Sequence, residues 1–182
     1  MRRGGVAPSV GFPPIGDTAA RALVLGSLPG VRSLQMQEYY AQPHNAFWRI
    51  MGELFGAGPE LAYAARLERL CAHGLAVWDV LAAGEREGSL DSAIVPASIV
   101  VNDFNAFFEQ HRRVRLICFN GKTAAALFRR KVLPGLAPEW AAIERHVLPS
   151  TSPAYASLRF PQKLAGWAAV LGRLPPVVRR AR

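Results

Sequence analysis

The sequence predicts an α/β fold in which a parallel β-sheet is covered by helices on both faces. One observation is that short apolar runs of strand character alternate along the chain with stretches of helical period, as in parallel α/β proteins. The other is that 51% of the 182 residues are hydrophobic, which is enough for one core in a chain too short for two full domains. Four strands are predicted, over residues 21–27, 75–80, 114–120 and 143–148.

The predicted domain spans residues 21–174. Residues 1–20 are rich in Gly and Pro and are expected to form a flexible lead-in, and residues 175–182 are expected to form a basic tail. Helices are predicted between the strands and after the last one, where Pro161 suits a first helical turn. Their ranges are 45–55, 60–72, 103–111, 121–131 and 161–174.

The charge and the cysteines narrow the class of protein. A net charge of +9 favours an anionic partner such as nucleic acid or an acidic surface. Cys71 and Cys118 are too few for a disulfide framework, a four-thiolate zinc site or an iron–sulfur cluster, and they are interpreted as buried thiols. The four histidines lack metal-ligand spacing, so no metal and no cofactor are expected. With no export signal and no apolar run long enough for a membrane span, a cytoplasmic protein without membrane contact is expected.

The loop after the first predicted strand is GSLPG, residues 26–30. Glycines at both of its ends allow backbone to approach a ligand closely, and ligands of parallel α/β sheets bind at the carboxyl ends of the strands. Aromatic rings and amides crowd into residues 39–48, and such side chains stack on and read a nucleobase. The alternative interpretation of Phe47 and Trp48 is that they form the core face of the next helix.

The loop after the fourth predicted strand carries three consecutive hydroxyl side chains between two prolines. These are Ser150, Thr151 and Ser152. Hydroxyl and backbone N–H donors on a rigid turn can hold a DNA phosphate. A solvated loop is the alternative interpretation.

Four motifs together resemble the uracil-DNA glycosylase superfamily. They are GSLPG, the downstream YYAQPHNAFW, FNGK at residues 119–122, and PSTSPA near the C-terminus. The pattern is most similar to the hypoxanthine-DNA glycosylase branch, with mismatch-specific thymine/uracil glycosylases as relatives, and it covers residues 21–174. The resemblance implies a three-layer α/β/α sandwich with a central four-stranded parallel sheet.

The same resemblance implies a monofunctional DNA glycosylase of base excision repair. Such an enzyme flips a deaminated base, here hypoxanthine, uracil or both, out of DNA and hydrolyses its N-glycosidic bond with water. Double-stranded DNA is the expected partner, with single-stranded DNA as a second substrate, and a monomer is expected.

Position 28 departs from the family pattern. Many relatives carry there an Asp or Asn that positions water, whereas this chain has Leu28, and an aliphatic group cannot orient water. The resemblance to the hypoxanthine branch suggests Asn45 as the catalytic substitute. Asn45 also suits the N-cap of the following helix, and the two roles are compatible.

The resemblance assigns base-binding roles to four residues. The backbone N–H groups of Ser27 and Leu28 would stabilise the leaving base, and Tyr40 takes the place of the aromatic stacker. Asn120 follows the third predicted strand, and its amide offers both a donor and an acceptor to a keto base. A turn-forming role before glycine is the alternative for Asn120. Lys122 is expected to touch phosphate.

In the second motif, Ser150 stands where some uracil-specific relatives carry a histidine that stabilises the departing base. The two hydroxyls after it would grip phosphate. Ala154 is small where certain relatives place a leucine wedge, so Tyr155 or Arg159 is expected to fill the gap that the flipped base leaves in the minor groove.

Two carboxylates, Asp79 and Asp91, are interpreted as structural, because a loop aspartate commonly accepts hydrogen bonds from nearby backbone N–H groups. Two alternatives to a glycosylase stay open. Because of Leu28, the chain is also interpretable as a non-catalytic damaged-DNA binder of the same superfamily. A nucleotide-binding α/β protein is disfavoured, since neither GxGxxG nor a Walker motif occurs.

Overall fold

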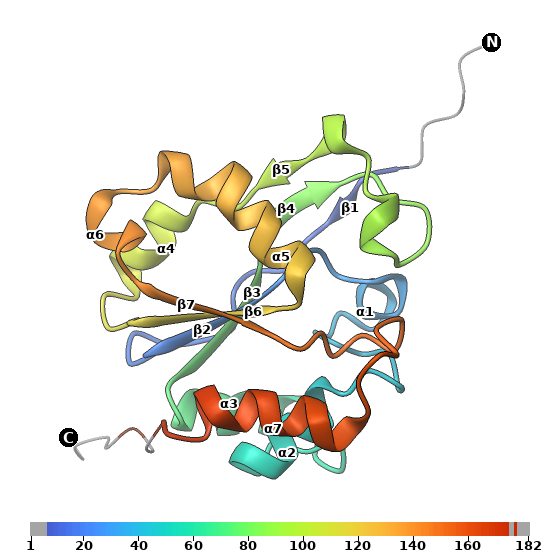
Figure 1. Ribbon diagram of the computed structural model, residues 1–182, viewed down its shortest axis with the longest axis vertical. Coiled ribbons are helices and arrows are strands. Elements are labelled where there is room, and N and C mark those ends of the chain that lie inside the picture. The colour runs from blue at the N-terminus through green and yellow to red at the C-terminus, as the bar shows by residue number, and fades with distance from the viewer. Residues whose placement is uncertain (1–6, 175–176, 178–182) are drawn as a thin grey trace.

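The computed structural model describes residues 7–174 and residue 177 (Figure 1). Its main sheet has four parallel strands in the order β3-β2-β6-β7. The central strand β2 is buried along its whole length, which explains why its sequence is an unbroken apolar run. The predicted fold class is therefore confirmed. The strands are β2 (Ala22–Gly26), β3 (Leu75–Asp79), β6 (Leu116–Asn120) and β7 (Glu144–Leu148).

Helices cover both faces of this sheet and complete the three layers (Figure 1). One layer contains α2 (Phe47–Phe55), α3 (Tyr63–Ala72) and α7 (Phe160–Leu171). The other contains α4 (Phe104–Gln110), α5 (Lys122–Leu127) and α6 (Pro138–Ala141). A π-helical turn over Phe128–Val132 and a 3₁₀ turn over Leu133–Gly135 continue α5. No described helix is long and apolar enough to cross a membrane.

A second, antiparallel sheet was not predicted. It has the order β1-β4-β5 and extends from the end of β3. Its strands have two to four residues each, too few to show a period of two in the sequence. They are β1 (Ser9–Val10), β4 (Leu81–Gly84) and β5 (Val100–Val101), with 3₁₀ turns over Asp91–Ala93 and Pro96–Ser98 between the last two.

The expected lead-in is described from residue 7 onward, and this part packs on the domain. Besides β1, Ile15 forms a bridge with Val77, and the Trp78 indole N–H donates to the Phe12 carbonyl over 3.0 Å. Of the expected basic tail, only residue 177 lies within the described chain.

The first helix after the GSLPG loop, α1 (Val31–Met36), was also not predicted. The next one, α2, begins at Phe47, and Phe47 and Trp48 are 0% and 4% exposed. Their interpretation as helix core is therefore confirmed. The Trp48 indole N–H donates to the Tyr39 carbonyl over 2.8 Å, which ties the aromatic segment to the helix.

Candidate active site

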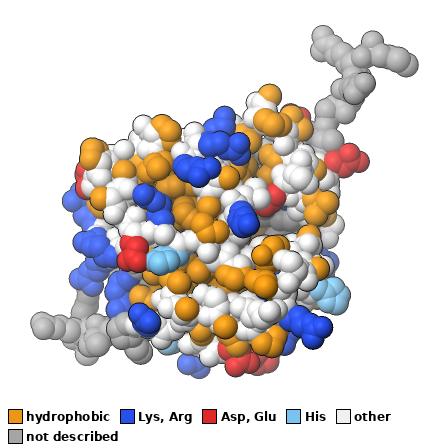
Figure 2. All heavy atoms as spheres, in the orientation of Figure 1, with side chains coloured by type: hydrophobic (Ala, Val, Ile, Leu, Met, Phe, Trp, Pro, Cys, Tyr) orange, Lys and Arg blue, Asp and Glu red, His pale blue; other side chains and the backbone are white. Residues whose placement is uncertain are grey.

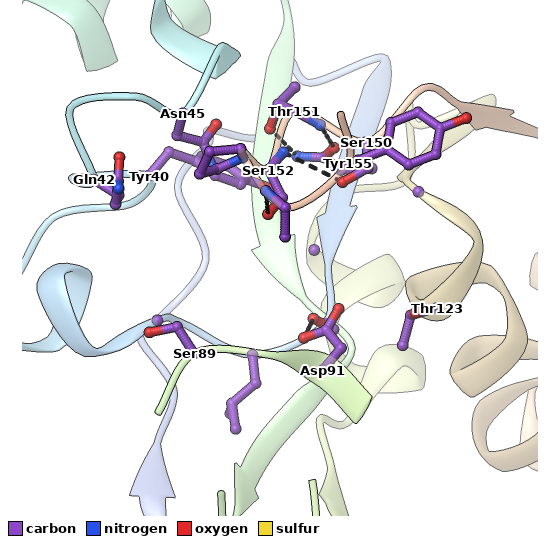
Figure 3. A pocket seen from close by; sticks show the side chains of 18 of the residues that line it. Tyr40, Gln42, Asn45, Ser89, Asp91, Thr123, Ser150, Thr151, Ser152 and Tyr155 are labelled. Atoms are coloured by element: carbon purple, nitrogen blue, oxygen red, sulfur yellow. Dashed lines mark hydrogen bonds between the residues drawn. The ribbon is translucent and has the colours of Figure 1, made fainter. Parts of the chain in front are cut away.

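A pocket of about 760 Å³ lies at the carboxyl ends of all four parallel strands (Figure 3). This volume is within the range of about 300–1,000 Å³ that is usual for small-ligand sites. The pocket is bordered by the GSLPG loop, the segment around Tyr40 and Asn45, a stretch ending at Asp91, and the loop that follows β7. All the predicted site residues border it except Arg159, which precedes α7.

The GSLPG loop is hydrogen-bonded to a buried arginine. Arg86 is 4% exposed, and its guanidinium donates to the carbonyl oxygens of Leu28 and Pro29. The Leu28 side chain is 6% exposed and reaches Gly84 of β4, so it packs into the core although the residue borders the pocket. Nothing in the sequence around Arg86 signals this contact, because it joins segments almost sixty residues apart.

Asp91 joins Arg86 and the GSLPG loop. The Ser27 hydroxyl donates to Asp91 Oδ1 over 2.6 Å, and Arg86 Nη1 lies 3.3 Å from the same oxygen. Burial raises the pKa of Asp91, while the hydrogen bond from Ser27 and the charge of Arg86 oppose the rise. The Asp91 side chain is still 35% exposed and borders the pocket, so a bound molecule can reach it.

Asp79 is the last residue of β3 and lies beside Gly26 of β2. Its side chain is buried, and Oδ2 has no hydrogen-bond partner within the described residues. Burial, and then the charge of Asp91, raise the pKa of Asp79 to about 7, against the opposing effect of Arg86. A Cβ at position 26 would collide with Asp79 Oδ1, so only glycine leaves room for this carboxyl group.

Tyr40 adopts a left-handed backbone conformation, with φ of 54°, which is uncommon for a residue other than glycine. Its ring stacks on Phe47 with the centroids 4.0 Å apart, so Phe47 supports one face of Tyr40. The hydroxyl is buried near Gly26 and has no hydrogen-bond partner within the described residues. Burial and the charge of Asp79 raise the pKa of this hydroxyl, which keeps it protonated.

Asn45 lies where the two main loops meet (Figure 3). Its Oδ1 accepts the Phe47 backbone N–H over 3.0 Å, but the N-cap of α2 is Ala46, so Asn45 lies one residue before the cap position predicted for it. The adjacent Ala46 N–H donates to the Thr151 carbonyl over 2.9 Å, so the Asn45 segment is fastened to the loop after β7. The amide nitrogen of Asn45 makes no hydrogen bond within the described chain and can bind a ligand.

Asn120 and Thr151 form a reciprocal pair. The Asn120 amide nitrogen donates to Thr151 Oγ1 over 2.8 Å, and the Thr151 backbone N–H donates to Asn120 Oδ1 over 2.8 Å. Thr151 is 1% exposed, so its hydroxyl faces Asn120 and not the solvent, in contrast to the phosphate grip expected from the sequence. Asn120 borders the pocket and also lies beside the Tyr40 hydroxyl, whose pKa it lowers against the larger effects of burial and Asp79.

The remainder of the loop after β7 is supported by α7. Trp167 donates its indole N–H to the Pro149 carbonyl over 2.9 Å, and Lys163 Nζ donates to the Ser152 carbonyl over 3.2 Å. Tyr155 is 37% exposed and borders the pocket, with the Lys163 ammonium 5.3 Å from its ring centroid. Of the two side chains expected to fill a gap in DNA, Tyr155 is therefore the one next to the pocket.

The pocket lining is mainly aromatic and polar. It combines tyrosine rings, three side-chain amides, loop hydroxyls and Lys122 with the carboxyl groups of Asp79 and Asp91. Figure 2 shows Lys and Arg side chains on several parts of the viewed face, with fewer Asp and Glu. Within the part of the chain that the structure describes, no group of three or more His, Cys, Asp or Glu side chains could hold a metal ion.

Comparisons with known proteins agree with this geometry. A model of the uracil DNA glycosylase superfamily matches residues 13–170. A protein of Methanosarcina acetivorans named hypoxanthine DNA glycosylase is 38% identical over 156 aligned positions, which cover 75% of this chain and 98% of the relative. A protein of the same name from Methanosarcina barkeri is 40% identical over 113 positions, which cover 62% of this chain and 70% of the relative.

A solved structure is similar as well. It is a solution NMR structure of a Methanosarcina acetivorans protein provisionally named uracil DNA glycosylase, and it has a TM-score of 0.75 and 36% identity to this chain. The similarity covers 92% of this chain and 98% of the other. The family match, the relatives and the pocket at the strand ends all lead to the same conclusion: the chain belongs to the uracil DNA glycosylase superfamily.

Proposed function

We propose that this chain is a monofunctional glycosylase of base excision repair that removes hypoxanthine, uracil or both from DNA. As a member of the superfamily, it is a DNA glycosylase, a hydrolase of N-glycosidic bonds in DNA. The observation that carries the finer proposal is the pocket at the strand ends, where Tyr40 and Asn45 of one loop come together with Asn120 at the end of β6. The names of the two Methanosarcina relatives support hypoxanthine as a substrate.

The proposed reaction begins with flipping of the damaged base out of the duplex. Flipping costs a few kcal/mol and is easiest for a mispaired base, so it already favours deaminated sites. The flipped base would stack on the free face of Tyr40, since the other face is covered by Phe47. The Asn120 amide would contact the keto edge, and the backbone N–H groups of Ser27 and Leu28 would stabilise the departing base.

Hydrolysis needs a positioned water molecule. In the proposed mechanism, the Asn45 amide orients it, because Asn45 borders the pocket and its amide nitrogen is unengaged. Ser150, Ser152 and Lys122 would bind the flanking phosphates, and Tyr155 would fill the gap in the duplex. Thr151 would act indirectly, by holding Asn120 and the loop in place.

The alternative is a non-catalytic protein that binds damaged DNA. It is favoured by one observation, the burial of the Leu28 side chain at the place of the usual water-positioning residue. The test is incubation with duplexes and single strands that carry hypoxanthine or uracil, the duplexes with each normal base opposite, followed by alkali to reveal abasic sites. Cleavage after alkali is expected. Binding without cleavage would support the alternative, and neither binding nor cleavage would exclude both functions.

A further inference from the structure

The pocket contains a carboxylate in a place that the sequence pattern does not indicate. Position 28 carries leucine in place of the acidic or amide side chain of many relatives. Asp91, from a distant segment, instead accepts a hydrogen bond over 2.6 Å from Ser27, the residue before Leu28. Asp91 is the first residue of a short 3₁₀ turn between β4 and β5. In the view of Figure 3 it faces the pocket from the side opposite Asn45.

The two oxygens of Asp91 have different surroundings. Oδ1 accepts from Ser27 and Arg86, and Arg86 is itself fixed by the carbonyls of Leu28 and Pro29. Oδ2 has no hydrogen-bond partner within the described residues. One oxygen therefore fixes the orientation of the carboxylate, while the other is free to act on a bound molecule.

A negative charge in a pocket for DNA opposes binding, because the substrate is a polyanion. The same charge becomes favourable when the bond between the sugar and the base stretches, since positive charge then develops at the sugar carbon C1′. Interactions that are stronger in the transition state than in the ground state are the ones that accelerate a reaction. Asp91 meets this condition, whereas a neutral side chain would not.

We propose that Asp91 is a second catalytic residue, which supplies the carboxylate that position 28 lacks. This inference rests on the proposed glycosylase function. The bond between C1′ and the base nitrogen breaks, and its electron pair leaves with the base. Water held by Asn45 adds its oxygen to C1′ and releases a proton, which a second pocket water relays to Asp91 Oδ2 on the opposite side. Asp91 then passes that proton to solvent, and the released base takes up one proton from solvent, so the carboxylate is regenerated.

The proposal predicts a pH dependence of the chemical step. The groups that face Asp91 are Ser27, Arg86, Asp79 and Tyr40. Burial raises the pKa of Asp91, and Ser27 and Arg86 lower it. Because only the ionised form can balance charge and accept a proton, the rate of base release should rise with pH as Asp91 loses its proton.

The test compares Asp91→Asn with Glu87→Gln in single-turnover base release from a hypoxanthine duplex. Asp91→Asn keeps an oxygen that can accept from Ser27 but removes the charge. Glu87 is exposed and precedes Asp91 in the same segment without bordering the pocket, so Glu87→Gln controls for the loss of one negative charge near DNA. Binding is measured separately by fluorescence anisotropy, with a duplex whose 2′-fluoro sugar resists hydrolysis.

For Asp91→Asn we expect the rate of base release to fall by at least about 100-fold, because a general base is lost. The Kd for DNA should stay unchanged or become tighter, and the acid limb of the pH profile should flatten. Asp91→Glu should recover part of the rate and retain that limb, which a purely structural role would not predict. A rate of Asp91→Asn within about threefold of the control would overturn the proposal, as would parallel losses of rate, binding and melting temperature. If Asp91→Asn does not fold, a wild-type rate that is flat with pH would overturn it. An inactive wild type would instead refute the glycosylase function itself.

Discussion

Replacement of Asp79 by Asn should make the free energy of unfolding less dependent on rising pH. Asp79 is buried at the floor of the pocket, and its pKa is raised from 3.8 to about 7 by burial and by the charge of Asp91. Between these two pKa values the folded protein holds a proton that the unfolded chain has already released. The free energy of unfolding therefore falls as pH rises through this window, and the Asn variant lacks this contribution.

The structure sets the size of the effect. The two pKa values are about three pH units apart, and about two of these units lie above pH 5. At about 1.4 kcal/mol for each unit, the wild type should lose about 3 kcal/mol relative to Asp79→Asn between about pH 5 and pH 8, as an upper bound. Asn has nearly the same shape and fits beside Gly26 as Asp does.

Urea denaturation of both proteins across this pH range, followed by circular dichroism, measures the difference directly. Glu87→Gln serves as the control, since it removes an exposed carboxylate from the segment that follows β4. If the stabilities of wild type and Asp79→Asn stay parallel within about 0.5 kcal/mol from about pH 5 to pH 8, the assigned burial and charge of Asp79 are wrong.

Asn45→Ala should lower the single-turnover rate of base release by about 100-fold or more, from loss of a positioned catalytic group, while Kd for DNA changes little; an unchanged rate would remove Asn45 from the reaction. Gly26→Ala should lower the melting temperature, because the added Cβ collides with the buried Asp79 carboxyl group. Gly135→Ala is the control and should not lower it, because a Cβ there meets nothing within 4 Å. Equal melting temperatures of the two variants would contradict the packing at β2. Thr151→Val should cost about 1–3 kcal/mol in urea denaturation, since it leaves the partly buried Asn120 amide without its acceptor, and a loss no larger than that of Ser152→Ala would refute the pairing. DNA binding should weaken steeply with salt in anisotropy titrations, from release of counterions, and a flat salt dependence would argue against phosphate contacts.

The sequence predicted the main sheet because β2, β3 and β6 are largely apolar runs with buried residues, whereas β7, at the edge of the sheet, is mostly exposed and carries polar residues. It also predicted a site after β2 and β7, since the residues that border the pocket follow directly on these strands. It did not predict β1, β4 or β5, which are short and depend on partners distant in the chain. Local pattern cannot reveal strands whose stability comes from tertiary contacts.

The same reason explains what was missed in the site. Arg86 has its polar partners at Leu28, Pro29 and Asp91, and neither its position nor its neighbours in sequence mark it as buried. Asp91 was interpreted as structural because a loop aspartate commonly accepts nearby backbone N–H groups, and its hydrogen bond with Ser27, 64 residues away, leaves no signal in the local sequence. Asn120, by contrast, was found from its place at a strand end, but its pairing with Thr151 depends on how the loop after β7 folds back.

Two sets of hydrogen bonds join the segments that border the pocket. The Asn45 segment is bonded to the loop after β7 through Ala46 and Thr151, and Thr151 is bonded in turn to Asn120 at the end of β6. On the opposite side, Arg86 holds the GSLPG loop and Asp91 together. The proposed water-orienting amide and the proposed carboxylate are thus fixed by two independent sets of hydrogen bonds. In the proposed mechanism, these two groups would act on the sugar in place of the side chain that Leu28 lacks, because the fold brings Asn45 and Asp91 to the same pocket.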